Sequence, residues 1–302
     1  MPTRARASAP AEHHPAAYPQ LLAVVLIWGL NFTVSKWSLR EFPVLGFTAL
    51  RFAIASLLLL AVLRWREGSI RPAPGTLRGL ALLGVTGNSV YQLCFIIGLS
   101  LTTASNSALV LASMPAMVAG LAFAFGLERV TPRAAEGLVL ASIGVVLVVA
   151  ARGLALGGHT LGGDLLSFGA VICWAVFTLG VRRLPHGISP LAITTWTMVL
   201  GTPVLFLLGV PSLVRMDWGA VSLLGWAGLV YSAAMSLVVA YVLWNNSVRV
   251  IGSSRTAVFA CITPLVAMAS AALILHERPT PLQLAGAGAI LGGVILSQRP
   301  AR

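Results

Sequence analysis

The sequence is poor in charge. Only 9% of its 302 residues are charged, while 58% are hydrophobic, and an ordinary soluble domain carries about 25% charged residues. So little polar material cannot cover the surface of a soluble globule of this size. The composition therefore excludes a soluble enzyme, a secreted disulfide-rich scaffold and a disordered chain, and it predicts an integral membrane protein.

Acidic residues are the scarcest charged type, with 8 Asp and Glu against 20 Lys and Arg. The basic residues lie at the ends of apolar runs rather than along one patch. This distribution suits anionic lipid headgroups and topology signals better than it suits nucleic acid. We therefore expect membrane lipids, and no nucleic acid, among the partners of the chain.

Residues that bind metals or perform catalysis are also few. The 3 cysteines, Cys94, Cys173 and Cys261, lie in separate apolar runs without a C-x-x-C pair, so each is expected to be a small buried hydrophobe. No group of Ser, His and acid can be placed on one membrane face. We expect no metal, no cofactor and no catalytic residues, and hence not an enzyme.

Long apolar runs make up most of the chain. A helix needs about 20 apolar residues to cross the hydrocarbon of a membrane, and ten such runs are separated by short links rich in charge, Pro and Gly. They lack the alternation of a barrel strand, which predicts an all-α fold. The predicted spans are residues 19–38, 43–64, 77–99, 103–127, 131–151, 163–182, 189–210, 219–246, 252–275 and 280–298.

The distribution of Arg predicts the orientation of these spans. With the N-terminus inside, most Arg residues fall on the cytoplasmic side, so both termini are expected in the cytoplasm beneath a bacterial-type inner membrane. Residues 1–18 are polar and are expected to form a disordered cytoplasmic tail. The small residues at 7–11 precede the first apolar run, whereas a signal-peptide cleavage site would follow it. That run is therefore expected to be a membrane span.

The chain contains an internal repeat. Residues 128–132, Glu-Arg-Val-Thr-Pro, correspond to residues 277–281, Glu-Arg-Pro-Thr-Pro, and Pro115 corresponds to Pro264. Each half then has five spans, an odd number, so the second half must be upside down relative to the first. Secondary transporters are built in this way, with the substrate near the midplane between the halves. We expect one five-helix repeat at residues 19–151 and the other at residues 160–302, forming one transmembrane unit.

The sequence resembles the ten-helix EamA-type branch of the drug/metabolite transporter superfamily in three stretches. These are residues 27–36 (Ile-Trp-Gly-Leu-Asn-Phe-Thr-Val-Ser-Lys) with Pro43 and Arg51 after them, residues 103–129, and their echo at residues 253–278. The resemblance implies transport of small metabolites, often export, through a cavity formed by the first, third and fourth helices and their counterparts. Within the superfamily the sequence is similar to the aromatic amino-acid and cationic-drug exporters of the YddG type.

Polar and aromatic residues inside the spans are candidates for a cavity lining, because a polar group in hydrocarbon costs free energy unless it is paired or wetted. Aromatic walls with a few amides and hydroxyls suit a flat, mostly apolar solute with a polar end. The same residues can instead bond neighbouring helices or form the interfacial aromatic belt, where Trp244 is expected. The candidate substrate-binding residues are Trp28, Asn31, Asn88, Tyr91, Gln92, Trp174, Thr178, Tyr231, Met235 and Tyr241.

Two cations and two prolines carry further predictions. Lys36 and Arg51 lie within or near spans, and both are expected to extend their charged ends to the outer interface. No Asp or Glu lies in the middle of a predicted span, which argues against an antiport mechanism based on carboxylates. Pro115 and Pro264 occupy matching positions, so they are either paired hinges or static kinks.

These features predict a secondary transporter for small-molecule substrates. It is expected to export amino acids, aromatic or otherwise amphipathic, or related drugs by alternating access through a central cavity. A lipid-translocating or membrane scaffold protein is an alternative, and a membrane-embedded enzyme is a weaker one because clustered acids and histidines are lacking. The Gly288-x-x-x-Gly292 pattern is compatible with a monomer or with a homodimer.

Overall fold

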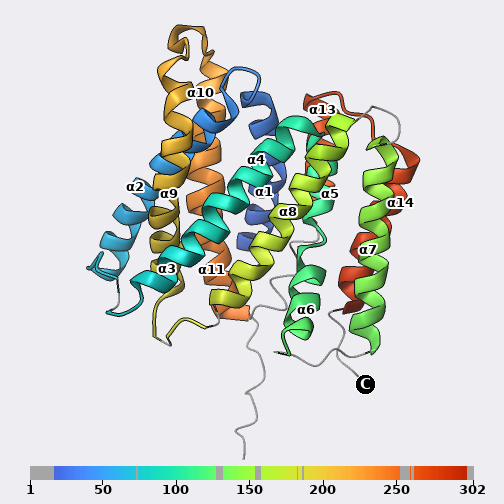
Figure 1. The fold of residues 1–302 in the computed structure, drawn as a ribbon, viewed down its shortest axis with the longest axis horizontal. Helices are drawn as coiled ribbons and strands as arrows, with labels where there is room; N and C mark the ends of the chain where they lie inside the picture. Colours follow the sequence, from blue (N-terminus) through green and yellow to red (C-terminus); the bar gives the residue numbers. More distant parts are fainter. Residues whose placement is uncertain are drawn as a thin grey trace, which may run out of the picture.

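The computed structural model describes residues 17–297 except residues 73, 127–131, 154–157, 182, 186, 252–258, 260 and 261. Within these residues the chain is helical with short connections and contains no strand (Figure 1). Residues 1–16 of the predicted tail, residues 128–131 of the repeated string and Cys261 lie outside the described residues.

The described parts of the apolar runs are largely helical, because a chain in lipid must satisfy its backbone hydrogen bonds internally. The two halves contain corresponding helices, and among the residues that the structure describes each half has one π-helical segment within a longer helix. The first half contains α1 (Ala17–Ser38), α2 (Val44–Glu67), α3 (Leu77–Gly84), the π-helix η1 (Val85–Val90), α4 (Tyr91–Leu101), α5 (Ala104–Leu111), α6 (Met114–Ala124) and α7 (Pro132–Gly153). The second half contains α8 (Gly158–Val181), α9 (Pro190–Val214), the 3-10 helix η2 (Trp218–Ala220), α10 (Leu223–Val230), the π-helix η3 (Tyr231–Val239), α11 (Ala240–Ile251), α13 (Thr263–Ile274) and α14 (Pro281–Ser297).

The helices lie where the apolar runs predict them, and the prediction of an all-helical membrane protein is confirmed. In the described part of the chain, six helices are long and apolar enough to cross a membrane. These are Tyr18–Ser38, Val44–Glu67, Leu77–Leu101, Thr160–Val181, Pro190–Val214 and Leu223–Trp244. Four further apolar helices are shorter, namely Ala104–Val118, Ala135–Val148, Thr263–Ile274 and Pro281–Leu296. Ten full spans therefore remain a prediction.

Helix boundaries follow local capping chemistry. Ser189 precedes α9 and its hydroxyl accepts a hydrogen bond from the backbone N–H of Ala192 at 2.9 Å, while Pro190 takes the first helical position. The fourth predicted span is not one continuous helix, because α5 ends at Leu111 and α6 begins at Met114. The break falls at residues 112–113, just before Pro115.

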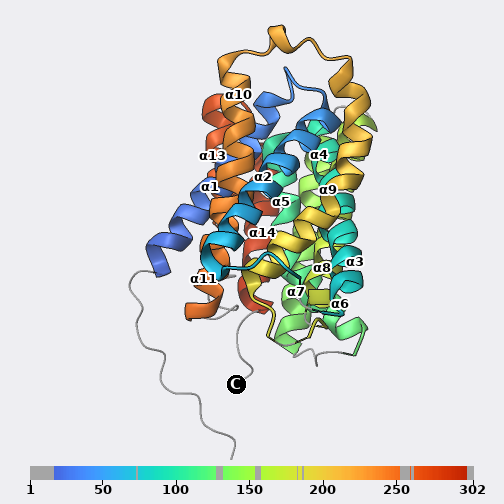
Figure 2. The same cartoon turned by 90° about the vertical axis from the view of Figure 1, so that its left-hand side faces the viewer.

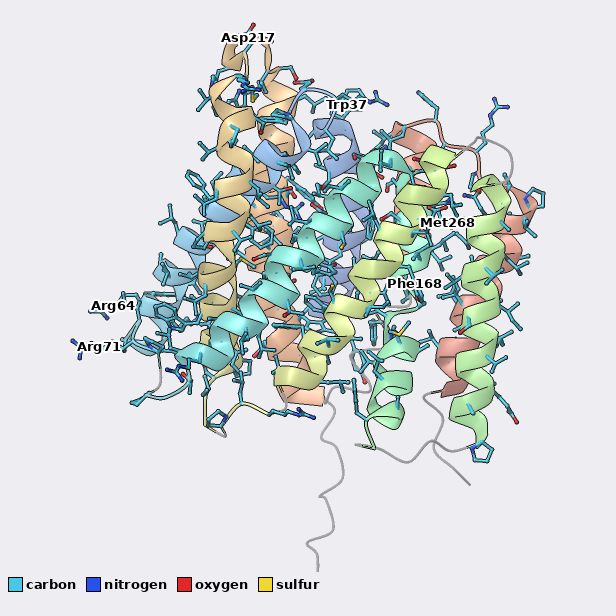
Figure 3. The ribbon with its side chains drawn as sticks, in the orientation of Figure 1. Trp37, Arg64, Arg71, Phe168, Asp217 and Met268 are labelled. Atoms are coloured by element: carbon cyan, nitrogen blue, oxygen red, sulfur yellow. The ribbon has the colours of Figure 1, made fainter. Side chains whose placement is uncertain are left out.

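Corresponding helices of the two halves run in opposite directions. Helix α1 ends beside Trp37 at the top of Figure 3, and α2 descends to Arg64 at the bottom. In the second half α8 descends from the top, and α9 rises toward Asp217 at the top (Figures 1 and 3). The start of α1 and the end of α14 lie at the bottom, on the same side of the molecule (Figure 1).

The halves are joined by pairs of corresponding helices. Helix α2 packs against α9 and α7 packs against α14, so each helix meets its own counterpart (Figures 1 and 2). Helix α4 packs against α8, and its counterparts η3 and α11 pack against α1. Exchange of the two halves therefore preserves this pairing, and the interface between them runs through α1, α4, α8 and α11.

Glycines on both helices allow α7 and α14 to approach closely. A Cβ atom placed on Gly144 would lie 2.7 Å from the carbonyl oxygen of Gly286, and one placed on Gly286 would lie 2.8 Å from that of Gly144. Neither position has room for a side chain. By contrast, a Cβ atom on Gly288 would meet no described atom within 4 Å. The close contact thus uses Gly286, and also Gly293 against Ala141, rather than the predicted Gly288–Gly292 pattern.

Candidate functional site

Four of the predicted aromatic residues come together at the interface between the halves. The ring centroids of Tyr91 and Trp174 are 5.1 Å apart, those of Trp174 and Tyr241 are 6.3 Å apart, and those of Trp28 and Tyr241 are 5.8 Å apart. Trp28 and Tyr91 belong to the first half, and Trp174 and Tyr241 to the second. Three more rings extend the group, and we call all seven the aromatic cluster: Trp28, Tyr91, Phe95, Trp174, Phe177, Tyr241 and Trp244.

Trp244, expected in the interfacial belt, also contacts the aromatic cluster. Its ring centroid lies 5.1 Å from that of Trp28. Because Trp244 and Tyr241 are three residues apart on α11, they share one face of that helix. Both rings therefore face α1.

The two π-helical segments lie next to the two central tyrosines. Segment η1 ends at Val90, immediately before Tyr91, and η3 ends at Val239, two residues before Tyr241. A π turn shifts the register of the residues that follow it and is frequent at functional sites. Within η1, Gly87 lies against the Phe177 ring, since an added Cβ would come within 2.2 Å of it. No pattern in the sequence indicates these segments.

Hydrogen bonds fix the rings next to η3. The indole N–H of Trp28 donates to the backbone carbonyl of Ser236 at 3.1 Å. The hydroxyl of Tyr231 donates to the carbonyl of Ile27 at 3.0 Å, one residue before Trp28 in α1. These two bonds join the first helix of one half to the π segment of the other, so the Trp28 ring is held in place at the interface.

Arg51 lies inside the protein, and the prediction that it reaches the outer interface was wrong. Its side chain is 1% exposed. One terminal nitrogen, Nη1, donates to the hydroxyl of Ser232 at 2.8 Å, and the other, Nη2, donates to the amide oxygen of Gln92 at 2.7 Å. Three phenylalanine rings, from Phe47, Phe52 and Phe95, surround the guanidinium at 5.7–5.9 Å. The sequence places Arg51 in a helix but does not show which face it occupies.

Of the predicted amide side chains, Asn31 and Gln92 lie near Arg51, whereas Asn88 lies against α9. The hydroxyl of Ser35 donates weakly to the Asn31 side chain at 3.4 Å and lies 3.5 Å from the hydroxyl of Ser232. Asn31 thereby connects to Arg51 through two serines. We call this set the Arg51 network: Asn31, Ser35, Arg51, Gln92 and Ser232. Asn88 is 5% exposed and lies on η1 against Gly201 of α9.

Four of the predicted residues belong neither to the aromatic cluster nor to the Arg51 network. The Thr178 hydroxyl donates to the carbonyl of Trp174 within its own helix at 2.8 Å. The Met235 side chain is 37% exposed. Pro115 and Pro264 are each the second residue of a helix, α6 and α13, where a backbone N–H has no helical partner to lose. Each proline therefore begins a helix rather than kinking the middle of one.

A second buried polar group lies where α4, α5 and α8 meet. Asp164 is fully buried in α8, seven residues into the helix. Its carboxylate accepts from the Thr102 hydroxyl at 2.6 Å and from the Asn106 amide at 3.1 Å, and Asn106 accepts from the Gln283 amide. The Lys36 ammonium donates to the carbonyls of residues 99, 100 and 102 at 2.5–2.9 Å. We call this the Asp164 network: Lys36, Thr102, Asn106, Asp164 and Gln283.

Comparison with known proteins identifies the family. The model of the EamA-like transporter family matches this chain twice, at residues 16–150 and 161–298. The chain belongs to the EamA-like transporter family. It is therefore a multi-pass membrane transporter of the EamA family and not an enzyme.

Several relatives of this EamA protein are similar over nearly their whole length. "Uncharacterized transporter YyaM" of Bacillus subtilis is 28% identical, covering 93% of each chain. A "Probable amino-acid metabolite efflux pump" of Salmonella typhimurium is 29% identical, covering 91% of this chain and 92% of the relative. A "Probable terminal-alkyne amino-acid exporter" of Streptantibioticus cattleyicolor is 27% identical, covering 92% of each chain. A solved crystal structure shares the fold with a TM-score of 0.63 at 17% identity, covering 93% of this chain and 96% of its own.

The chemistry that this EamA protein can offer is binding rather than bond making. Among the described residues, no group of three or more His, Cys, Asp or Glu is placed to hold a metal ion. The interface between its halves presents ring faces from four helices and, next to them, a buried guanidinium with two neutral partners. Such surroundings can hold a solute that has an apolar body and a polar end.

Proposed function

We propose that this protein exports amino acids, aromatic or otherwise amphipathic, or related drugs by alternating access through a site at the aromatic cluster. The observation that carries the proposal is the meeting of rings from both halves, Trp28 and Tyr91 from one and Trp174 and Tyr241 from the other. A solute bound between inverted halves is exposed to either side as the halves rock against each other. The names of the efflux pump and the amino-acid exporter support an amino acid as the solute.

The transport assay uses purified protein in proteoliposomes. Counterflow of a labelled aromatic amino acid is measured, with a panel of other amino acids and quaternary amines as competitors. Tyr91→Ala and Trp174→Ala are expected to reduce counterflow by at least about tenfold, because each removes a ring from the shared site. Trp218→Ala is the matched control, since Trp218 is 44% exposed and, among the described rings, stacks on Trp226, which is not part of the aromatic cluster.

Each outcome separates the candidates. Equal counterflow in Tyr91→Ala, Trp174→Ala and the control would remove the aromatic cluster from the transport path. Vesicles that move none of the solutes but exchange labelled phospholipid between leaflets would favour the alternative of a lipid-translocating protein. Selective loss in the two cluster variants supports the proposal.

We also infer the topology that goes with this function. The protein has a cytoplasmic tail at residues 1–18 and two inverted repeats at residues 19–151 and 160–302, with both termini in the cytoplasm beneath the inner membrane. Arg64 near the end of α2 and Asp217 just after α9 lie at opposite ends of the molecule (Figure 3), and Ser69 follows α2 within two residues of its last residue, Glu67. In intact cells a membrane-impermeant thiol reagent should label Asp217→Cys, whereas Ser69→Cys should need permeabilisation. The reverse pattern would contradict this orientation.

Pro115 and Pro264 are proposed as hinges for alternating access. Both prolines stand at helix beginnings in matching positions of the repeat, where few helical hydrogen bonds resist bending. Pro115→Ala and Pro264→Ala are expected to slow counterflow. Unchanged rates in both variants would indicate static breaks.

A further inference from the structure

The Arg51 guanidinium is a buried cation without an acidic partner. Its side chain is 1% exposed, yet its two bonded partners, Gln92 and Ser232, are neutral. Among the described residues no Asp or Glu forms an ion pair with it. Arginine inside a membrane protein is costly and usually pairs with an acid or a carbonyl, or faces a ligand pathway. The protein therefore maintains a positive charge here that its own described side chains do not neutralise.

The hydrogen-bonding capacity of Arg51 is also incompletely used. A guanidinium has five N–H donors arranged as a planar fork. The buried Nε atom has no hydrogen-bond partner, and each of the two terminal nitrogens has one donor bond. The Phe47, Phe52 and Phe95 rings contribute only cation–π attraction at 5.7–5.9 Å. A carboxylate, which accepts bidentate bonds from this fork, has the geometry and the charge that are missing.

The position of Arg51 connects it to the aromatic cluster. Its partner Gln92 directly follows Tyr91, and Phe95 lies over Arg51 while also stacking on Tyr91 with centroids 6.1 Å apart. A solute whose apolar body rests on the rings would bring a polar end to the guanidinium.

The buried cation is present in the first half but not at the corresponding position of the second half. Pro43 corresponds to Pro190, so the position of Arg51 in α2 corresponds to Met198 in α9. Met198 is 1% exposed and packs with Phe52 in an apolar core. At this pair of matching positions the halves thus provide one cation rather than two, which fits a solute with one anionic group.

We propose that Arg51, with Gln92 and Ser232, forms the subsite for the carboxylate of the transported solute. This inference rests on the proposed export of amino acids and specifies which end of the solute the site recognises. Gln92 and Ser232 orient the guanidinium by accepting from its terminal nitrogens, so they act as positioning residues.

The test compares solutes that differ only at the carboxylate. In proteoliposomes, labelled phenylalanine counterflow is competed with phenylalanine, phenylalaninamide and phenethylamine. For the wild-type protein we expect phenylalanine to compete at least about tenfold better than either analogue, since a charge-assisted bidentate contact is lost in both. In Arg51→Gln this ratio should fall to near one, and Arg51→Lys should retain part of it. Trp218→Phe is the control and should keep the wild-type ratio.

A second variant keeps the arginine and removes its free charge. Gln92→Glu places a carboxylate on the Arg51 fork, so it should abolish the preference for phenylalanine while the protein remains folded, as judged by monodisperse elution and thermal stability. A wild-type ratio in Arg51→Gln or in Gln92→Glu would overturn the inference. Wild-type flux without discrimination between phenylalanine and its amide would overturn it while leaving the proposed export intact, whereas no flux of any solute would overturn both.

Discussion

The two buried polar networks of this protein differ in how completely their charged groups are hydrogen-bonded. In the Asp164 network the Lys36 ammonium donates to three backbone carbonyls, and the Asp164 carboxylate accepts from Thr102 and Asn106. In the Arg51 network the guanidinium has two neutral partners and a buried Nε without one. Buried polar groups in native proteins are nearly always satisfied, so an exception requires an explanation.

The difference separates a structural role from a binding role. Lys36 belongs to α1, but its ammonium reaches the C-terminal end of α4. There its charge complements the helix dipole and the carbonyls that have no partner within the helix. Glu277 complements the dipole at a helix N-terminus. Its carboxylate accepts from the backbone N–H groups of residues 104 and 105 at the start of α5. Substitutions at these ends should change stability and leave solute preference unchanged, whereas substitutions at Arg51 should change preference.

Asp164→Ala should have the largest effect on stability. It leaves the Thr102 hydroxyl and the Asn106 amide buried without their acceptor, which costs roughly 2–3 kcal/mol in the free energy of unfolding. Reversible unfolding by SDS in mixed micelles measures this. Asp217→Ala, which alters an exposed carboxylate that accepts from the N–H of Gly219, is the control and should cost less than about 0.5 kcal/mol. The phenylalanine-to-amide ratio should stay at the wild-type value; a lost ratio would mean that the Asp164 network also shapes the site.

Lys36→Met should have the next largest effect. The change removes three charge-assisted bonds to the carbonyls at the end of α4, so we expect a loss of about 1–2 kcal/mol. The same unfolding assay applies. Arg40→Met provides the control, because Arg40 is exposed and only stacks on Trp37 at 4.7 Å. If Lys36→Met abolished the solute preference without lowering the unfolding free energy, Lys36 would have a binding role, and the proposed difference between Lys36 and Arg51 would be wrong.

Glu277→Gln should cost less, about 0.5–1 kcal/mol. The neutral amide still accepts through one oxygen, but it loses the favourable interaction of a negative charge with the start of α5 and one of its acceptor positions. The unfolding free energy at low ionic strength measures the loss, and added salt should diminish it. A loss above about 2 kcal/mol would indicate that Glu277 does more than cap α5.

Much of the fold follows from the sequence because it depends on local properties. Apolar runs of sufficient length fixed the helix positions, and the odd number of spans in a repeat fixed their opposite directions. Tyr91 of α4 and Tyr241 of α11 belong to corresponding helices, and their rings meet at the interface through Trp174. Such pairs can be inferred because inverted halves bring corresponding helices to a shared boundary.

The remaining features depend on contacts between distant segments. Hydropathy gives the depth of Arg51 in the membrane but not its neighbour, so the sequence did not distinguish a residue that reaches lipid headgroups from one bound to Ser232. Nothing local marks η1 and η3 as π-helical, because the extra residue is accommodated by packing against other helices. Glu277 is likewise close to the start of α5 only after both halves have assembled.

The smallest expected effect is the coupling between the two networks. They share no residue, and Gln92 and Thr102 are ten positions apart in or beside α4, which corresponds to about 15 Å along a helix. The unfolding free energies of Asp164→Ala, Arg51→Gln and the double variant should therefore add to within about 0.5 kcal/mol. Asp164→Ala with Asn106→Ala is the positive control, since those side chains are in contact and should show measurable coupling. A coupling above about 1 kcal/mol between Asp164 and Arg51 would mean that the end of the bundle and its centre respond together, and the stabilising network would then be part of the transport cycle.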